Sequence, residues 1–290
     1  MEFIFISIRG CECMKKFEAY RELKKNKTAL VGFFIILFLL VLALIGPAIA
    51  PYNPLIPQPL KRLQGPSWDH LFGTDSLGRD IFSRVIYGSR ISIIIGLISV
   101  TISLIPGTLL GLLSGYYGKR VDEPIMRVMD ILLAFPAILL AIFITAILGP
   151  SLINTMVAVG IVYIPHYARI VRSSVLSLKE QLFVQAVTSL GGSNIRIISC
   201  HIFPNTLSPI IVYATLGMGT AVLQAAALGF LGLGAQPPSP EWGAMLSEGR
   251  QYIQNAPHVA TFPGLAILAL VLGFNLFGDG LRDILDPSLK

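Results

Sequence analysis

The sequence has little charge and almost no cysteine. Charged residues account for 13% of its 290 residues and hydrophobic residues for 54%, whereas soluble globular proteins carry about 25% charged residues. Three cysteines are too few for a secreted scaffold held together by several disulfides. The sequence also lacks the Gly-x-x-x-x-Gly-Lys-Ser/Thr phosphate loop and the His-Glu-x-x-His zinc motif. We therefore expect a membrane protein that is not an enzyme and does not hydrolyse ATP by itself.

Long runs without charged residues predict helices that cross a membrane. A hydrocarbon core about 30 Å thick is crossed by about 20 apolar helical residues. Backbone in lipid must be hydrogen-bonded within the protein, which leaves helices or closed barrels, and these runs lack the alternation that a barrel needs. We predict an all-α polytopic membrane protein with six transmembrane helices. They lie near residues 30–50, 90–114, 129–148, 152–168, 206–230 and 263–281, with Gly149-Pro150-Ser151 as the turn between the third and fourth.

Lys and Arg are concentrated on one side of the predicted membrane. Sixteen of the 22 lie in the N-terminal segment, the loops after the second and fourth helices, and the tail. Because cytoplasmic loops carry an excess of Lys and Arg, both termini are predicted to be cytoplasmic, and no nucleic-acid surface is expected. The predicted organisation is a cytoplasmic arm over residues 1–27 and a six-helix domain over 28–290, with external segments at 51–89 and 231–262 and a cytoplasmic loop at 173–204.

The predicted helices have almost no ionisable side chains in their central parts. Such side chains mark proton relays and ion sites in membrane proteins, so a proton- or sodium-coupled carrier is disfavoured. Cys11 and Cys13 would supply only two thiolates to a metal, and the four histidines are scattered. We predict no metal site and no bound cofactor. Met14 is a more natural start for the basic arm, which makes residues 1–13 a candidate over-extended reading frame.

The loop between the fourth and fifth helices is too long for a simple connector. Apolar residues at broken helical spacing predict a short helix, and Gly191 with Gly192 predicts its end and a sharp turn. Ser193 can cap a second short helix, and Pro204 begins the fifth long helix. A helix, a glycine turn and a helix form a knob suited to a groove in a partner protein. The alternative is an amphipathic helix that lies on the bilayer.

At this loop the sequence resembles the permease subunits of ABC importers. Their signature is Glu-Ala-Ala, three residues, Gly, nine residues and Ile-x-Leu-Pro, and Ala186, Gly191 and Pro204 agree with it in residue type and spacing. Four other positions depart from it, which is tolerable for a motif that works through helix shape and a glycine turn. The resemblance implies that the loop couples the chain to an ATPase subunit through Gln185, Ala186, Val187, Gly191, Gly192, His201 and Pro204.

Further motifs resemble the branch of these importers that carries dipeptides, oligopeptides or nickel. They lie at residues 72–90, 228–243 and 278–287, and the resemblance extends from about residue 20 to residue 290. It implies the type I ABC importer permease fold in the prokaryotic inner membrane, with this chain as the second of two unlike permeases. Peptides are the favoured substrate. Nickel or a nickel chelate is the alternative, and a secondary carrier or a channel-like protein is less favoured.

The same resemblance implies a set of partners. They are a second, unlike permease, two ATPase subunits that bind ATP and magnesium, and an extracytoplasmic solute-binding protein. The lipid bilayer surrounds the assembly.

Polar residues inside the predicted helices are candidates for lining a translocation path, and the alternative for each is a hydrogen bond between helices. Residues of the external segments are candidates for contact with the binding protein, and the alternative is local pairing of aspartates with Arg79 or Arg84. The path candidates are Asn154, Tyr163, Tyr213 and Gln224, and the binding-protein candidates are Asp75, Arg79, Asp80, Glu241 and Trp242.

Glycines and prolines of the predicted helices indicate how the helices pack and bend. Gly107, Gly111 and Gly115 recur every four residues in the second helix, a spacing typical of close helix contact. Proline interrupts helical hydrogen bonding. The prolines expected to kink a helix are Pro106, Pro136 and Pro165.

Overall fold

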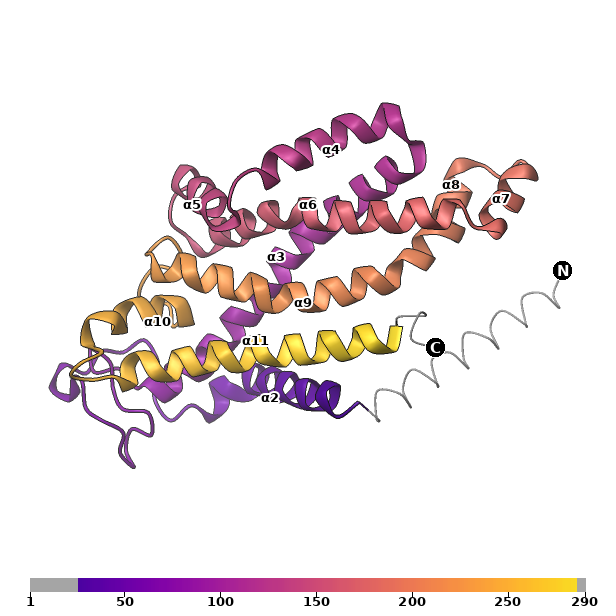
Figure 1. Cartoon of the computed structure of the whole chain (residues 1–290). Coiled ribbons are helices and arrows are strands. Elements are labelled where there is room, and N and C mark those ends of the chain that lie inside the picture. Colours follow the sequence, from indigo (N-terminus) through magenta and orange to yellow (C-terminus); the bar gives the residue numbers. More distant parts are fainter. Residues whose placement is uncertain (1–25, 286–290) are drawn as a thin grey trace.

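The computed structural model describes residues 26–285, which form a bundle of long helices without a β-strand in that range (Figure 1). Cys11, Cys13 and the predicted N-terminal arm up to residue 25 lie outside the described residues. The long helices are α2 (Lys27–Ile49), α3 (Ile81–Tyr117), α4 (Lys119–Leu133), α5 (Ala137–Leu148), α6 (Leu152–Lys179), α9 (Phe203–Phe230) and α11 (His258–Leu285), and the short ones are α7 (Leu182–Ser189), α8 (Asn194–Arg196) and α10 (Trp242–Gly249). Short turns of other helical types lie at Pro59–Lys61, Ile197–Ile202 and Arg250–Tyr252.

Within residues 26–285, four helical stretches are long and apolar enough to cross a membrane, and the bent pair of α4 and α5 would make a fifth. The four are α2, α3, α11 and the stretch Asn194–Phe230. The helix α6 coincides with the predicted fourth span but is more polar and extends to Lys179. The prediction of an all-helical membrane protein is therefore confirmed at the level of four to five apolar spans.

The helix predicted over residues 129–148 is broken. The helices α4 and α5 lie at 90° to one another. Pro136 precedes α5 with φ −55° and ψ 130°, outside the helical region. Proline has no N–H to donate and disfavours helical geometry in the residue before it. The kink predicted at Pro136 is a full break between two helices, whereas α3 and α6 continue as single helices through Pro106 and Pro165.

The glycines of α3 allow a close approach to α6, as predicted. A Cβ atom at Gly107 would lie 2.5 Å from the Tyr167 Cβ, and one at Gly111 would lie 2.7 Å from the Val171 Cβ. Gly115 faces α6 in the same way one turn later. Without side chains at these positions the backbones approach closely and gain van der Waals contact, which is how helices associate in lipid.

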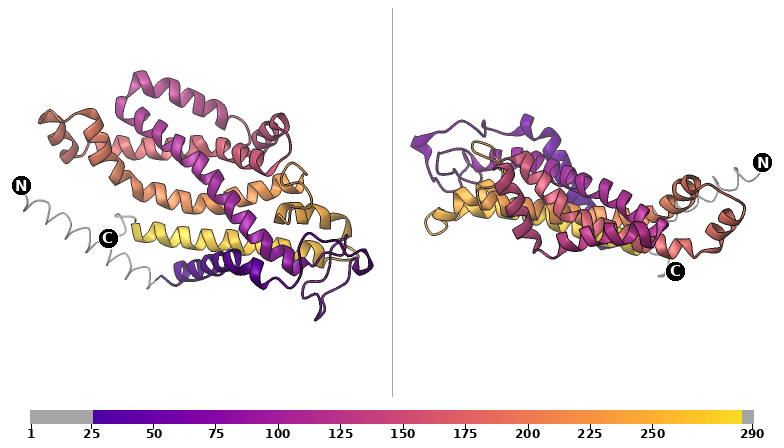
Figure 2. Two further views of the ribbon diagram at one scale, coloured as in Figure 1. Left: turned by 180° about the vertical axis from the view of Figure 1, so that it is seen from behind. Right: turned by 90° about the horizontal axis from the view of Figure 1, so that it is seen from above.

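The two ends of the bundle differ in structure (Figures 1 and 2). Residues 180–202, here called the knob, project from one end and contain α7 and α8. Residues 50–80 and 231–257, here called the cap, lie at the other end and contain α10. Because α6 continues to Lys179, the knob is shorter than the predicted loop 173–204. Because α3 begins at Ile81 and α11 at His258, the two parts of the cap are shorter than the predicted external segments 51–89 and 231–262.

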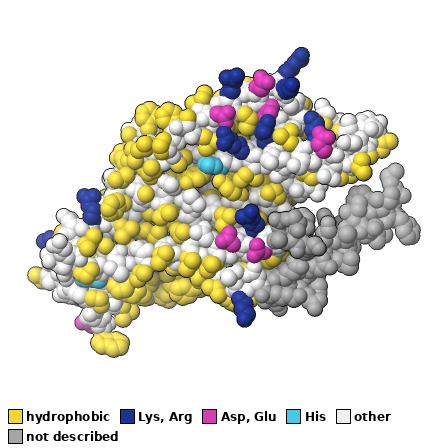
Figure 3. Space-filling model, viewed as in Figure 1, with side chains coloured by type: hydrophobic (Ala, Val, Ile, Leu, Met, Phe, Trp, Pro, Cys, Tyr) yellow, Lys and Arg dark blue, Asp and Glu magenta, His cyan; other side chains and the backbone are white. Residues whose placement is uncertain are grey.

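Large apolar side chains cover much of the surface between the knob and the cap (Figure 3). On α2 the exposed fractions are 61% for Phe34, 63% for Phe38 and 81% for Leu44. Contiguous apolar surface of this kind is not expected of a soluble monomer. Most charged side chains visible in Figure 3 lie near the knob end of the bundle and a few lie over the cap, so the apolar band between them suits a lipid environment.

Candidate functional site

The turn in the knob is a glycine-terminated helix end. Gly191 has φ 78°, in the left-handed region that favours glycine. Its N–H donates to the Thr188 carbonyl at 3.0 Å, and the Gly192 N–H donates to the Val187 carbonyl at 3.0 Å. This pair of hydrogen bonds is a Schellman motif. The predicted helix end and sharp turn at Gly191 and Gly192 are therefore confirmed.

The second half of the knob leads directly into α9. The Ser193 hydroxyl oxygen accepts from the Arg196 N–H at 3.4 Å, so Ser193 caps α8 as predicted. A wider helical turn follows at Ile197–Ile202. The helix α9 then begins at Phe203, with Pro204 in its first turn.

The knob is anchored by one apolar cluster and exposes a different set of apolar side chains. Val184 and Ile197 are buried against α3 and α6, together with Val171 and Val175. The knob is thereby held in a fixed place at the ends of two long helices. Sequence periodicity did not separate the buried face from the exposed one. The strongly exposed apolar side chains are Leu182 at 82%, Leu190 at 88% and Ile195 at 78%.

The residues predicted for coupling lie together in the knob and at the start of α9. Gln185 and Ala186 are exposed on α7, and Val187 is half-buried. The Gln185 amide donates to the Glu180 carbonyl at 3.2 Å, within the knob. His201 is half-buried and Pro204 is exposed. Gln185, which stands where the family signature has Glu, therefore makes a hydrogen bond within the knob and not an ion pair.

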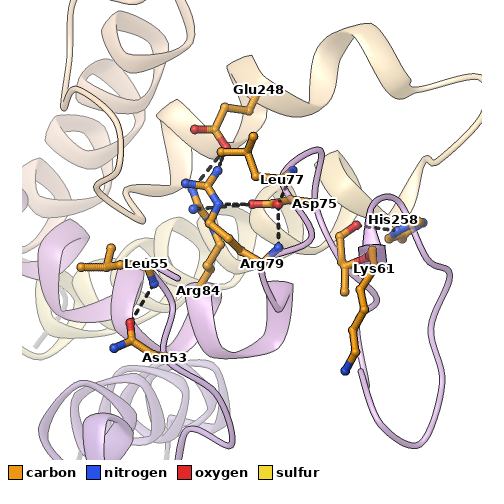
Figure 4. A network of polar contacts seen from close by, with 10 residues as sticks. Asn53, Leu55, Lys61, Asp75, Leu77, Arg79, Arg84, Glu248 and His258 are labelled. Carbon is orange, nitrogen blue, oxygen red and sulfur yellow. Dashed lines mark hydrogen bonds and ion pairs between the residues drawn. The ribbon is translucent and has the colours of Figure 1, made fainter. Parts of the chain in front are cut away.

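The two parts of the cap are joined by buried ion pairs (Figure 4). The Arg79 guanidinium donates to Asp75 at 2.6 Å and to Glu248 at 2.7 Å. Arg84 lies 3.2 Å from the same Glu248 oxygen and 3.5 Å from Asp75. The arginine side chains are at most 1% exposed, so solvent screens these pairs little. Local pairing of Asp75 with the arginines, the alternative left open by the sequence, is confirmed.

A second buried contact fixes the start of α3. One oxygen of Asp80 accepts the Ser83 N–H at 2.8 Å, which is a helix cap. The other oxygen lies 2.9 Å from His70 Nδ1, and Lys61 Nζ lies 3.3 Å from His70 Nε2. Because an ammonium group only donates, Nε2 accepts and the imidazole proton lies on Nδ1. The cap at Asp80 explains why α3 begins well before its charge-free run.

Glu241 and Trp242 hold α10 in place. The Glu241 carboxylate accepts the N–H groups of Gly243 at 2.8 Å and Ala244 at 2.7 Å. Burial raises the pKa of Glu241, and these two N–H groups act in the opposite direction. The Trp242 indole N–H donates to the Val85 carbonyl at 3.0 Å. Both side chains therefore serve the packing of α10 against its neighbours.

The five residues predicted to contact a binding protein are all buried in this structure. Each is at most 3% exposed, and each contacts other residues of the cap or the start of α3. A partner could reach them only by displacing the cap. The side chains that the cap presents at its surface are others, above all Leu60 at 98% exposed and Trp68 at 97%.

The four path candidates fall into different environments. Tyr163 and Tyr213 line one cavity of about 90 Å³ between α3, α6 and α9. The Asn154 amide donates to two main-chain carbonyls at the end of α5, at 2.8 and 2.9 Å, and so closes the turn between α5 and α6. Gln224 is half-buried on α9 and does not line the cavity. Among the described residues, no group of three His, Cys, Asp or Glu side chains could hold a metal ion.

The arrangement of helices has a counterpart among solved structures. A chain of the MetNI methionine ABC transporter, solved in inward-facing conformations, is similar with a TM-score of 0.57 and 19% identity. The similarity covers 70% of this chain and 97% of that chain. The chain therefore shares its helical fold with a membrane-spanning transporter chain.

Sequence comparison identifies the family. Residues 107–290 match the binding-protein-dependent transport system inner membrane component family, and residues 17–66 match the N-terminal transmembrane domain of oligopeptide transport permease C. The chain is 56% identical over 273 residues to the dipeptide transport system permease protein DppC of Alkalihalophilus pseudofirmus, covering 94% of this chain and 90% of that protein. It is 50% identical over 274 residues to the glutathione transport system permease protein GsiD of Escherichia coli, covering 94% and 90%.

The chain belongs to the family of inner membrane components of binding-protein-dependent transport systems. It is a multi-pass permease of the bacterial inner membrane and a transport subunit, not an enzyme. Membership of this family implies partner ATPase subunits, which hydrolyse ATP, and a solute-binding protein.

Proposed function

We propose that the chain forms half of the translocation path for di- or oligopeptides in an ATP-driven importer. The observation that carries this proposal is its 56% identity, over 94% of its length, to a dipeptide permease. A di/tripeptide permease of Pseudomonas aeruginosa is 49% identical. These relatives favour peptides over nickel, the alternative that the sequence left open.

The proposed topology has six crossings, made by α2, α3, the bent pair of α4 and α5, α6, α9 and α11. Both termini and the knob lie in the cytoplasm, and the cap lies outside. The supporting observation is the distribution of Lys and Arg, because sixteen of the 22 fall on the side of the knob and the termini. The bent pair completes one crossing even though its two helices are not collinear.

The proposed assembly contains a second, unlike permease and two ATPase subunits, and ATP and magnesium are bound by those subunits and not by this chain. The exposed apolar side chains of the knob, such as Leu182 and Leu190, support docking into a groove of an ATPase subunit. The knob is continuous with α6 on one side and with α9 on the other. A displacement of the knob on ATP binding therefore moves α6 and α9, two of the helices that line the cavity with Tyr163 and Tyr213.

Reconstitution tests the proposed function. The chain, its co-expressed permease partner, the ATPase subunits and the binding protein are placed in liposomes, and uptake of a labelled dipeptide and of ⁶³Ni²⁺ is measured with and without ATP. We expect ATP-dependent dipeptide uptake and no nickel uptake. ATP-dependent uptake of nickel without uptake of peptide would contradict the proposal. Uptake independent of ATP would instead indicate a secondary carrier.

A further inference from the structure

The cavity between α3, α6 and α9 is lined by hydroxyl groups inside an apolar cluster. The surrounding cluster consists of buried aliphatic residues such as Ile95, Val159 and Val162. The rings of Tyr167 and Tyr213 lie edge to face with centroids 5.0 Å apart. Each of the three helices contributes two hydroxyl groups, and no charged residue lines the cavity. The six hydroxyl-bearing residues are Ser99, Ser103, Tyr163, Tyr167, Tyr213 and Thr220.

Two of these hydroxyl groups are buried without a partner. Ser99 is 1% exposed and Tyr167 is 2% exposed, and neither hydroxyl oxygen has a well-aligned hydrogen-bond partner among the described residues. The Ser103 hydroxyl lies beside that of Tyr167 but already donates to the carbonyls of Ser99 and Val100. Gly217 leaves room for the tyrosine hydroxyl, because a Cβ atom there would lie 2.7 Å from it. A buried hydroxyl without a partner destabilises a fold. Two of them at one cavity indicate a site whose hydrogen-bond partner comes from outside this chain.

The chemistry of the lining restricts what that partner can be. A hydroxyl group both donates and accepts, so this set can satisfy an N–H and a C=O at the same time. Charged groups find no counter-ion among the lining residues. Its volume of about 90 Å³ is well above the roughly 10–15 Å³ that a single water needs, so the cavity has room for a small polar group such as one amide.

We propose that this cavity is a hydrogen-bonding subsite for the main-chain amide of the transported peptide. The inference rests on the proposed function, because it assigns a contact to the substrate class named there. Ser99 on α3 and Tyr167 on α6 are the residues that contact the amide. The subsite binds the main-chain groups that all peptides share. Because no lining residue is charged, binding does not depend on the charge of the peptide side chains. Because α6 and α9 continue into the knob, the walls of the subsite move with it.

Hydroxyl-deletion variants in the reconstituted importer test the subsite. Ser99→Ala and Tyr167→Phe remove the hydroxyls and keep the remaining shape. At saturating binding protein, we expect peptides imported per ATP hydrolysed to fall by between about 2-fold and 10-fold. The loss is expected to be equal for Ala-Ala, Asp-Ala and Lys-Ala. Ser92→Ala is the matched control, since Ser92 is also a buried, unpartnered serine of α3 but does not line the cavity.

Cysteine labelling gives a second readout that packing alone would not change. In a background with the three native cysteines replaced by serine, Ser99→Cys is expected to react with a small thiol reagent during turnover. Transported dipeptide is expected to protect it. Ser92→Cys is expected to show no such protection.

The outcomes separate the subsite from the proposed function. If the importer carries dipeptides but Ser99→Ala and Tyr167→Phe match Ser92→Ala, the subsite is refuted and the function stands. A loss that depends on the charge of the peptide side chain, or labelling of Ser99→Cys without protection, also refutes it. If the unmodified importer carries nickel and no dipeptide, the proposed function itself fails.

Discussion

Two glycines with positive φ separate local strain from coupling. Gly191 and Gly118 have φ of 78° and 77°, and a Cβ atom at either would meet nothing within 4 Å. A side chain is therefore disfavoured by its backbone and not by a clash. At Gly191 the cost is about 1–2 kcal/mol, and at Gly118 it is at least as large, because its ψ of −156° belongs to a region that essentially only glycine occupies. Gly191 lies in the knob, whereas Gly118 joins α3 to α4.

We expect Gly191→Val to uncouple the transporter. The strain is relieved by reshaping the turn, which displaces α7 relative to α8. ATP hydrolysis stimulated by loaded binding protein and peptide uptake are expected to fall several-fold in reconstituted complexes. Gly118→Val is the control and is expected to lose at least as much stability while retaining coupling. Equal transport in Gly191→Val and the unmodified protein would contradict this, as would equal losses in both variants.

Glu241 predicts a pH dependence of stability in the cap. Its pKa in the folded protein is raised above the usual 4.5 by burial, so the folded state holds the proton more tightly than the unfolded state. Stability contributed by this group therefore increases as pH falls through the raised pKa towards 4.5, and is absent at higher pH. Thermal unfolding of the unmodified protein and of Glu241→Gln at pH 7.5, 6.0 and 5.0 measures it. The difference between them is expected to shift in favour of the unmodified protein as pH falls, and a constant difference would refute the assignment.

At the scale of whole helices, glycines allow close packing between helices and a proline breaks one of them. The glycines of α3 permit its approach to α6, and Pro136 separates α4 from α5. Both features have local sequence signals, and both were predicted in kind. The extent of the break was not predicted. A proline removes a hydrogen bond and disfavours helical geometry next to it, but the neighbouring helices decide whether the chain kinks or turns by 90°.

We expect Gly111→Leu to disrupt the contact between α3 and α6. Its Cβ would lie 2.6 Å from the Ala168 carbonyl oxygen and 2.7 Å from the Val171 Cβ, and overpacking of this kind costs about 1–3 kcal/mol. The yield of monodisperse protein and its thermal midpoint in detergent are expected to fall. Gly264→Leu on α11 is the control, because the nearest atom to a Cβ there is 3.7 Å away. Equal effects of the two substitutions would contradict the packing argument.

At the scale of the whole molecule, contacts between distant parts of the chain close the cap. Arg79 and Glu248 are 169 residues apart, and their contact joins residues 50–80 to α10. An uncompensated arginine would remain if Glu248 lost its charge. The penalty for breaking a fully buried pair is about 3–5 kcal/mol, and it is lower here because the Glu248 side chain is 22% exposed.

Glu248→Gln is expected to loosen the cap without unfolding the bundle. Hydrogen exchange of the amides in residues 63–79 should increase. Exchange in the part of α3 that follows its first turns should not change. Asp69→Asn, at an exposed position of the same segment, provides the comparison. Unchanged exchange in Glu248→Gln would show that the ion pairs do not hold the cap.

The sequence by itself determined the all-helical membrane class, the apolar spans, the glycine contact of α3 and the helix–turn–helix of the knob. Each of these depends on hydropathy over one helix length or on the conformational preference of a single glycine, proline or serine, which neighbouring residues express locally. Only the tertiary structure decided that Asp75, Arg79, Asp80, Glu241 and Trp242 are internal, that Tyr163 and Tyr213 share a cavity while Asn154 closes a turn, and which side chains the knob exposes. These depend on contacts between segments far apart in the chain, where a charged residue can be buried because its partner arrives from another helix.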